Sequence, residues 1–145
     1  MKKVVLGAGA GYWGDILEPA VQMAETSDVQ YIGFDHLSEL TMAILNRKKA
    51  RDPAYGYIPD IIPSMRRILP AALARGIRLS TNAGGANPLA AAQAVKQLAE
   101  ELGTRSFKIG VVSGDNMLDQ VDALEDSGWQ FQNLDTGESG LDRIK

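Results

Sequence analysis

The stretch KVVLGAGAGYWGDILEPAVQMAE, residues 3–25, decides the fold prediction. It opens with a short apolar run, Lys3–Gly7, that is typical of a buried β-strand. A glycine-rich stretch follows, and a helical pattern then extends from Pro19 to Glu25. This order of strand, loop and helix is the repeating unit of α/β proteins, so we expect the rest of the chain to continue it.

The same alternation continues to residue 134 and predicts an α/β fold. We expect a doubly wound, Rossmann-like arrangement, in which a mostly parallel sheet of four or five strands carries helices on both faces. The prediction is a single domain over residues 1–134 and a polar tail over residues 135–145, whose end is either natural or a truncation. The expected strands are residues 3–7, 29–34, 77–81, 107–113 and 129–134, and the expected helices are residues 19–25, 37–51, 61–75, 88–102 and 117–126.

The composition excludes several classes of site. The chain has 145 residues, no cysteine and one histidine, His36, which excludes disulfides, thiolate ligands and HExxH metal motifs. The net charge of −3 argues against a nucleic-acid partner, because binding phosphates favours a basic face. No apolar run approaches the roughly 20 residues that span a bilayer, and no secretory leader is recognisable. We therefore expect a cytoplasmic protein with no membrane partner.

The glycine-rich first loop resembles a dinucleotide fingerprint. Gly9, Gly11 and Gly14 have the G-x-G-x-x-G spacing, and Asp35 follows Gly14 by 21 residues, where an acid can bind ribose hydroxyls. However, the first glycine of such a fingerprint usually ends the strand, and the dipeptide Glu18-Pro19 indicates that the helix begins late. An NAD(P)-binding oxidoreductase is therefore the less favoured alternative.

The third loop, NAGGANP at residues 82–88, has the composition of an anion site. Asn87 is the expected N-cap of the following helix, so free N–H groups would point into the crevice beyond the strands. Gly84 and Gly85 allow a ligand to approach the backbone closely, and the Asn82 carboxamide can both donate and accept hydrogen bonds. The alternative is that Asn87 only caps the helix and the glycines only turn the chain.

Carboxylates follow several of the expected strands. In a parallel sheet the side chains of Asp15, Glu18, Asp35 and Asp115 would converge at one edge. We interpret Asp15, Glu18 and Asp115 as catalytic acid–base groups or as ligands of a divalent metal, and the sequence does not identify the metal.

Three residues near the end of the second expected strand have two interpretations each. Asp35 and Glu39 are candidates for ligand binding, but either can instead stabilise the first turn of the next helix. The adjacent His36 is either a catalytic group or a surface residue.

Six motifs occur in order along nearly the whole chain: GAGAGYWGD-x-x-EPA (Gly7–Ala20), FDHLSELTMA (Phe34–Ala43), DPAYGY (Asp52–Tyr57), NAGGANP (Asn82–Pro88), VVSGDN (Val111–Asn116) and NLDTGE (Asn133–Glu138). In these motifs the chain resembles the N-terminal portion of the acyclic terpene utilisation protein A (AtuA) family. Family members continue well past the NLDTGE motif, so the chain is either a fragment or a short relative. The resemblance implies a role in the catabolism of acyclic terpenes, alongside acyl-CoA enzymes, and does not assign a reaction.

Three functions follow from these observations and stay open. The first is a catabolic enzyme that acts on a carboxylate or acyl-CoA intermediate of acyclic terpene or branched-chain acid degradation. In it Asn82, Gly84, Gly85 and Asn87 would hold an anionic small molecule, and coenzyme A thioester or a divalent metal would be the cofactor. The second is a non-catalytic binding or assembly module that a missing C-terminal region, a partner subunit or a homo-oligomer completes. The third is the NAD(P)-binding oxidoreductase.

Overall fold

The computed structural model describes residues 3–104 and 107–140 and divides into two compact units, residues 1–111 and 112–145. Each unit is described by itself. The interpretation of residues 1–134 as one domain stays a prediction. The elements of the first unit are β1 (Leu6–Ala10), α1 (Glu18–Thr26), β2 (Tyr31–Phe34), α2 (Glu39–Arg51), α3 (Ile61–Arg75), β3 (Arg78–Thr81) and α4 (Pro88–Glu101), and those of the second are the 3-10 helix η1 (Leu118–Gln120) and α5 (Val121–Asp126).

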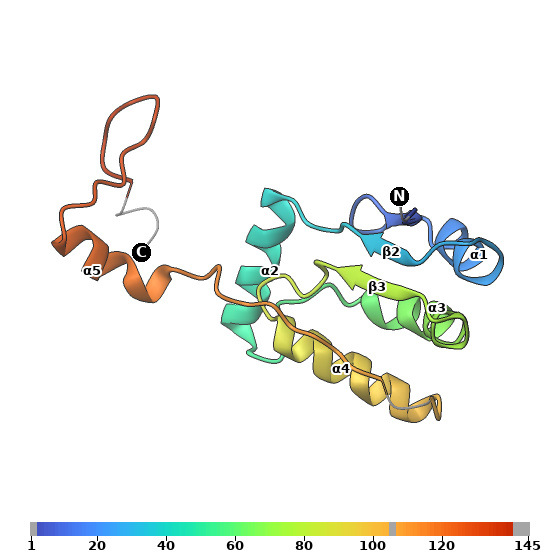
Figure 1. Cartoon of the computed structure of the whole chain (residues 1–145). Coiled ribbons are helices and arrows are strands. Elements are labelled where there is room, and N and C mark those ends of the chain that lie inside the picture. Colours follow the sequence, from blue (N-terminus) through green and yellow to red (C-terminus); the bar gives the residue numbers. More distant parts are fainter. Residues whose placement is uncertain (1–2, 105–106, 141–145) are drawn as a thin grey trace. The chain divides into compact units, whose positions relative to one another are not determined.

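The first unit is a mixed α/β structure built on a parallel sheet of three strands in the order β1-β2-β3 (Figure 1). Ile32 of β2 lies opposite Gly7 of β1 on one side and Leu79 of β3 on the other. Helix α1 connects β1 to β2, and helices α2 and α3 connect β2 to β3. Because all three strands are parallel, their carboxyl ends meet at one edge of the sheet.

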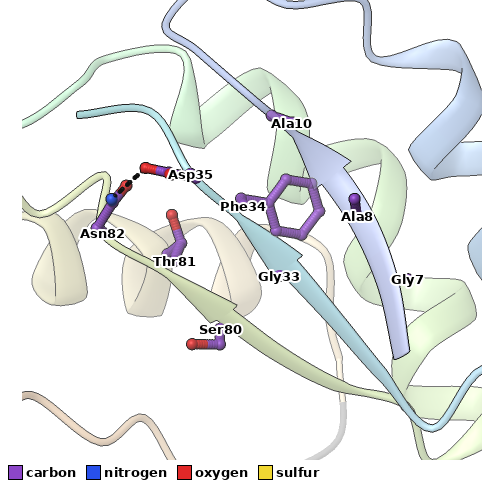
Figure 2. A pocket seen from close by; sticks show the side chains of 9 residues that line it. All are labelled: Gly7, Ala8, Ala10, Gly33, Phe34, Asp35, Ser80, Thr81 and Asn82. Atoms are coloured by element: carbon purple, nitrogen blue, oxygen red, sulfur yellow. Dashed lines mark hydrogen bonds between the residues drawn. The ribbon is translucent and has the colours of Figure 1, made fainter. Parts of the chain in front are cut away.

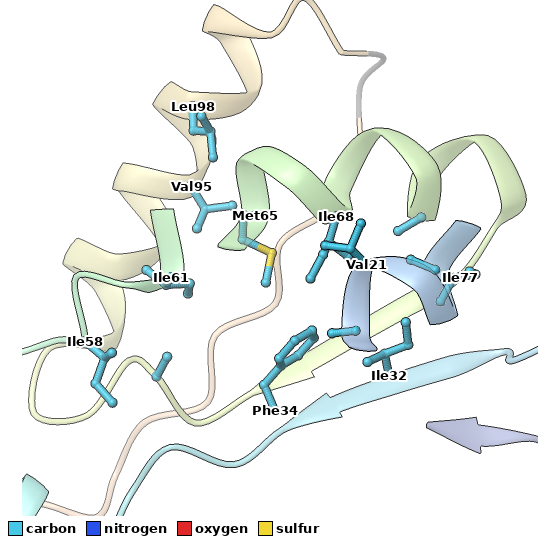
Figure 3. Packing of buried hydrophobic residues seen from close by; sticks show 14 of the residues in the cluster. Val21, Ile32, Phe34, Ile58, Ile61, Met65, Ile68, Ile77, Val95 and Leu98 are labelled. Atoms are coloured by element: carbon cyan, nitrogen blue, oxygen red, sulfur yellow. The ribbon is translucent and has the colours of Figure 1, made fainter. Parts of the chain in front are cut away.

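The core lies on one face of this sheet. Ile32 and Phe34 are buried and point from β2 toward α1 and α3, whereas Gly33 between them is exposed on the other face (Figure 3). Helix α4 packs against α3 and adds Val95 and Leu98 to the same hydrophobic cluster. This period-two burial is why a short β-branched and aromatic run forms a strand here.

The helix ends follow local sequence signals. The Ser38 hydroxyl accepts a hydrogen bond from the backbone N–H of Thr41 and so caps α2. Helix α3 ends at Gly76, whose φ of 70° lies in the left-handed region that glycine adopts readily. Helix α3 continues through Pro70, and buried side chains on either side of this proline hold the helix to the core.

The sheet is smaller than the sequence predicts. Four or five strands and a doubly wound arrangement are not confirmed, since the described residues form one three-stranded open sheet. Residues 107–113 form no strand, and Val112 among them is 94% exposed. The strand order advances in one direction only, so right-handed connections place α1 and α3 on the same face. β1 also begins at Leu6 instead of Lys3.

The second unit, described here to residue 140, contains the predicted helix over residues 117–126 as η1 followed by α5. The expected strand at residues 129–134 is reduced to one antiparallel bridge between Gln132 and Ser139. Residues 141–145 of the predicted tail lie outside the described residues. None of the helices in the described parts of the chain has the length and apolar character needed to cross a membrane.

Candidate ligand site at the carboxyl edge of the sheet

Asp35 and Asn82 form the centre of the candidate site. Asp35 directly follows β2 and Asn82 directly follows β3, so both side chains stand where parallel strands end. The Asn82 Nδ2 atom donates a hydrogen bond of 2.6 Å to Oδ1 of Asp35 (Figure 2). The Asn82 Oδ1 atom accepts a second bond of 2.8 Å from the backbone N–H of His36. Two residues that the sequence predicts separately as ligand-binding are thus in direct contact, and their role in binding stays a prediction.

A hollow of about 410 Å³ opens beside this pair. Ala8, Gly33 and Ser80 lie opposite one another in the register of the three strands and form a floor with almost no side chain (Figure 2). Asp35 and Asn82 lie at the carboxyl end of the hollow. One end can therefore form hydrogen bonds with a ligand, while the floor can accept an apolar chain.

The glycines of β1 are required for packing. A Cβ atom on Gly7 would overlap the Met23 sulfur of α1, and a Cβ atom on Gly9 would overlap the Phe34 ring. Both glycines therefore let neighbouring parts of the core approach the strand closely. Gly9, predicted as a ligand-binding residue, is buried and has this packing role in the structure.

The carboxylate of Asp15 closes the loop after β1 by bonding to backbone N–H groups of the same loop. The two Asp15 carboxylate oxygens accept hydrogen bonds of 2.8 Å from the Gly11 N–H and 2.7 Å from the Ile16 N–H. A pyrophosphate at this loop would need such N–H groups and would meet the negative charge of Asp15. This geometry disfavours the dinucleotide interpretation and gives Asp15 a structural role.

Trp13 anchors the same loop to two helices. Its indole Nε1 donates a hydrogen bond of 3.1 Å to Oδ2 of Asp60 at the start of α3. The Lys48 ammonium of α2 lies 5.3 Å from the centre of the Trp13 ring, within reach of a cation–π interaction. The loop is thus held in position between α2 and α3.

Glu18 stands in the first turn of α1 and forms an ion pair with Arg67 of α3. The hydrogen bond from Arg67, together with the positive charge of its guanidinium, lowers the pKa of Glu18 below its ordinary value. A carboxyl group with a lowered pKa is ionised near neutral pH and is a poor general acid. The structure therefore gives Glu18 a helix-linking contact and none with Asp35 or Asn82.

Asn87 caps α4 as predicted and also clasps a distant loop. Its Oδ1 atom accepts a bond from the Ala90 N–H, and its Nδ2 atom donates bonds of 2.8 Å to the carbonyls of Pro53 and Tyr55. Both N–H groups of the carboxamide thereby donate within the protein. This contact is the structural reason for an asparagine at this position.

The two glycines of the same loop are also constrained. Gly85 has a φ of 49°, and a Cβ atom there would overlap the Leu45 side chain. A Cβ atom on Gly84 would lie 2.8 Å from Cα of Pro88. The N–H groups of Gly85 and Asn87 bond to carbonyls of the loop itself, at Asn82 and Gly84. Few of the N–H groups predicted to hold an anion are therefore free.

Two predicted site residues remain, Glu39 and Asp115. Glu39 occupies the exposed first turn of α2, and Asp115 belongs to the second unit, where it is exposed. Within the described residues no group of three or more acidic or histidine side chains is arranged to hold a metal ion.

His36, expected to be either a catalytic group or a surface residue, is buried and bonded to the central pair, so the surface interpretation is wrong. The residue is only 8% exposed, its backbone N–H bonds to Asn82, and its ring stacks on Phe34 with centroids 6.2 Å apart. The alternation of β2 could have revealed this, because continuing it past Phe34 gives every second residue, including His36, a buried side chain.

Comparison with known proteins gives one match. A family model described as "Acyclic terpene utilisation family protein AtuA" matches residues 4–145. Neither the curated proteins nor the solved structures contain a match to the chain.

Proposed function

The chain belongs to the acyclic terpene utilisation family AtuA, and from this premise we propose that it is part of a catabolic enzyme. Its substrate would be a carboxylate or acyl-CoA intermediate of acyclic terpene or branched-chain acid degradation. Family membership supports a role in acyclic terpene utilisation. The substrate and the catalytic role are what we propose.

The proposal rests on one observation: the hollow has a floor of small residues and a polar end formed by Asp35 and Asn82. A branched acyl chain can lie over Ala8 and Gly33, where no protein side chain competes for the space. The Asn82 amide has a second N–H group that can donate to a substrate carbonyl. Burial of the apolar chain would stabilise the complex by about 0.8 kcal/mol for each methylene group.

Between the two substrate forms, this site favours the acyl-CoA thioester. The thioester carbonyl is uncharged, whereas a free carboxylate would meet the Asp35 carboxylate at the same end of the hollow. Ligand contact is assigned to Asp35 and Asn82 instead of Asn87, because both N–H groups of the Asn87 carboxamide already donate within the protein. Asp115 is exposed in the second unit, and its role as an acid–base residue stays a prediction from the sequence.

A thermal-shift comparison tests the proposal. Isovaleryl-CoA should raise the unfolding temperature of the wild-type chain more than isovalerate, coenzyme A alone, NAD or magnesium, since a ligand of the folded state stabilises it. Asn82→Ala should abolish the shift, and Lys96→Ala, on the exposed side of α4, should keep it. A response to NAD alone would support the oxidoreductase alternative, and isovalerate binding as tightly as the thioester would contradict the charge argument.

A second candidate function is a binding or assembly module, which the uncovered face of the sheet favours. Leu6 is 71% exposed there, and none of the described helices of the first unit packs over Ala8, Gly33 or Ser80. An exposed apolar sheet face commonly marks a protein interface. Light scattering distinguishes the candidates: a stable oligomer that Leu6→Lys disrupts, with no response to isovaleryl-CoA, would support the module.

A further inference from the structure

The surroundings of the His36 ring favour one tautomer. Its Nδ1 atom lies 3.3 Å from the backbone carbonyl oxygen of Tyr12. A carbonyl oxygen can only accept a hydrogen bond, so this contact is a hydrogen bond in the tautomer that carries its proton on Nδ1. In the neutral imidazole the other nitrogen, Nε2, is then unprotonated and presents a lone pair.

Three further contacts fix where this ring stands. The His36 ring stacks on Phe34 at an interplanar angle of 13°, and the backbone N–H of His36 is bound by Asn82. The Tyr12 carbonyl belongs to the loop that Trp13 anchors to α2 and α3. The ring is therefore preorganised by neighbours that are themselves held in place.

The Nε2 atom has no hydrogen-bond partner among the described residues and is not fully buried. Among the described residues no hydrogen bond or ion pair involves it. Every side-chain nitrogen or oxygen of the described residues that is fully buried does have a partner. An unpaired Nε2 must therefore reach the accessible surface, although His36 as a whole is only 8% exposed.

We propose that His36 is a proton-accepting residue at the carboxyl edge of the sheet, with Nε2 as the accepting atom. Its ligand is a protic group: a hydroxyl, a thiol or an activated water. The proton passes from the ligand O–H or S–H to Nε2, the ligand heteroatom keeps the bonding electron pair, and the imidazolium keeps its Nδ1–H bond to Tyr12. A backbone carbonyl that orients a histidine in this way is a recurrent feature of general bases. This inference rests on the contacts of His36 alone and goes beyond the proposed function.

Because the chain has one histidine, two measurements on the full chain can test the proposal without ambiguity. Nitrogen-15 NMR of the imidazole at alkaline pH should show the Nδ1–H tautomer, with Nε2 unprotonated. Diethyl pyrocarbonate should then transfer its carbethoxyl group to Nε2 and release ethanol and carbon dioxide. The rate of this modification at His36 should be within about tenfold of the rate in the urea-unfolded chain, because Nε2 is open in the native state.

A matched variant distinguishes a reactive His36 ring from one that serves only in packing. His36→Asn keeps an N–H donor for the Tyr12 carbonyl and removes Nε2, so it should fold and lose only the adduct at position 36. Carbethoxylation of exposed tyrosine and lysine side chains in the same sample provides the internal control. An Nε2–H tautomer, or modification slowed by more than about tenfold in the folded wild type, would overturn the proposal.

Discussion

The side chain of Asn82 holds the carboxylate of Asp35, with 2.6 Å between Nδ2 and Oδ1, and so joins the ends of β3 and β2. The same carboxamide accepts a hydrogen bond from the backbone N–H of His36. One residue thus connects the polar end of the hollow with the buried histidine.

Replacing Asn82 should destabilise the protein. Asn82→Ala removes both side-chain hydrogen bonds, and we expect a loss of about 1–3 kcal/mol in the free energy of unfolding, measured with urea. Ser80→Ala, on the exposed strand position beside it, is the control and should change stability little.

The interaction between Asp35 and Asn82 can also be tested by exchanging the two side chains. Asn82→Asp should be worse than Asn82→Ala, because it places two carboxylates against each other. The double variant Asp35→Asn/Asn82→Asp restores one amide and one carboxylate and should recover most of the lost stability. An additive double variant would show that the two side chains do not interact.

The ion pair between Glu18 and Arg67 should make stability depend on pH. The folded-state pKa of Glu18 is lowered from its ordinary value of 4.5, so the contribution of the pair is complete above that value. It is lost as the pH falls through the lowered folded-state pKa. Arg67→Ala should therefore lower the urea midpoint at pH 7 but not in strong acid, and high salt should shrink the difference. An equal difference at both pH values would argue for a packing effect.

Gly9→Ala should destabilise the core, because its methyl group would overlap the Phe34 ring. The expected cost is about 1–3 kcal/mol, typical of overpacking. Gly33→Ala, in the neighbouring strand, meets no atom within 4 Å and is the matched control. Phe34→Leu in the Gly9→Ala background should recover part of the loss, and a Gly9→Ala variant as stable as Gly33→Ala would refute the packing role.

Asn87→Ala should lower stability by about 1–2 kcal/mol, because it removes the cap of α4 and two bonds to the loop at Pro53 and Tyr55. Asn87→Ser keeps the cap alone and should lose less. We expect neither change to alter the shift with isovaleryl-CoA by more than the stability loss explains. A selective loss of ligand binding in Asn87→Ala would instead restore the anion role of this loop.

The sequence predicted the local features better than the long-range ones. The strands at residues 29–34 and 77–81 were located within two residues, since alternating apolar side chains reflect one buried face. Of the carboxylates expected to converge, Asp35 lies at the carboxyl end of the sheet, whereas Asp15 bonds to its own loop and Glu18 to Arg67. The run FKIGVVS at residues 107–113 has a strand-like composition too, but composition measures the tendency to be buried and does not supply a neighbouring strand.

The roles of the site residues depended on partners far away in sequence. Asn87 was correctly predicted as a cap, yet its bond to Pro53 spans 34 residues. Arg67 lies 49 residues from Glu18, and Trp13 lies 47 residues from Asp60. No local pattern contains such pairs, so the sequence alone does not reveal which polar side chains bond to distant parts of the protein.

The one-directional strand order bears on how the polypeptide assembles during translation. Each strand pairs with the one that left the ribosome just before it, so β2 finds β1 already exposed and β3 then finds β2. In a doubly wound sheet the first strand must wait for a much later segment on its other side. Short sequence separation between partners lowers the entropy of loop closure, and we expect each strand to join the nascent sheet as it is synthesised.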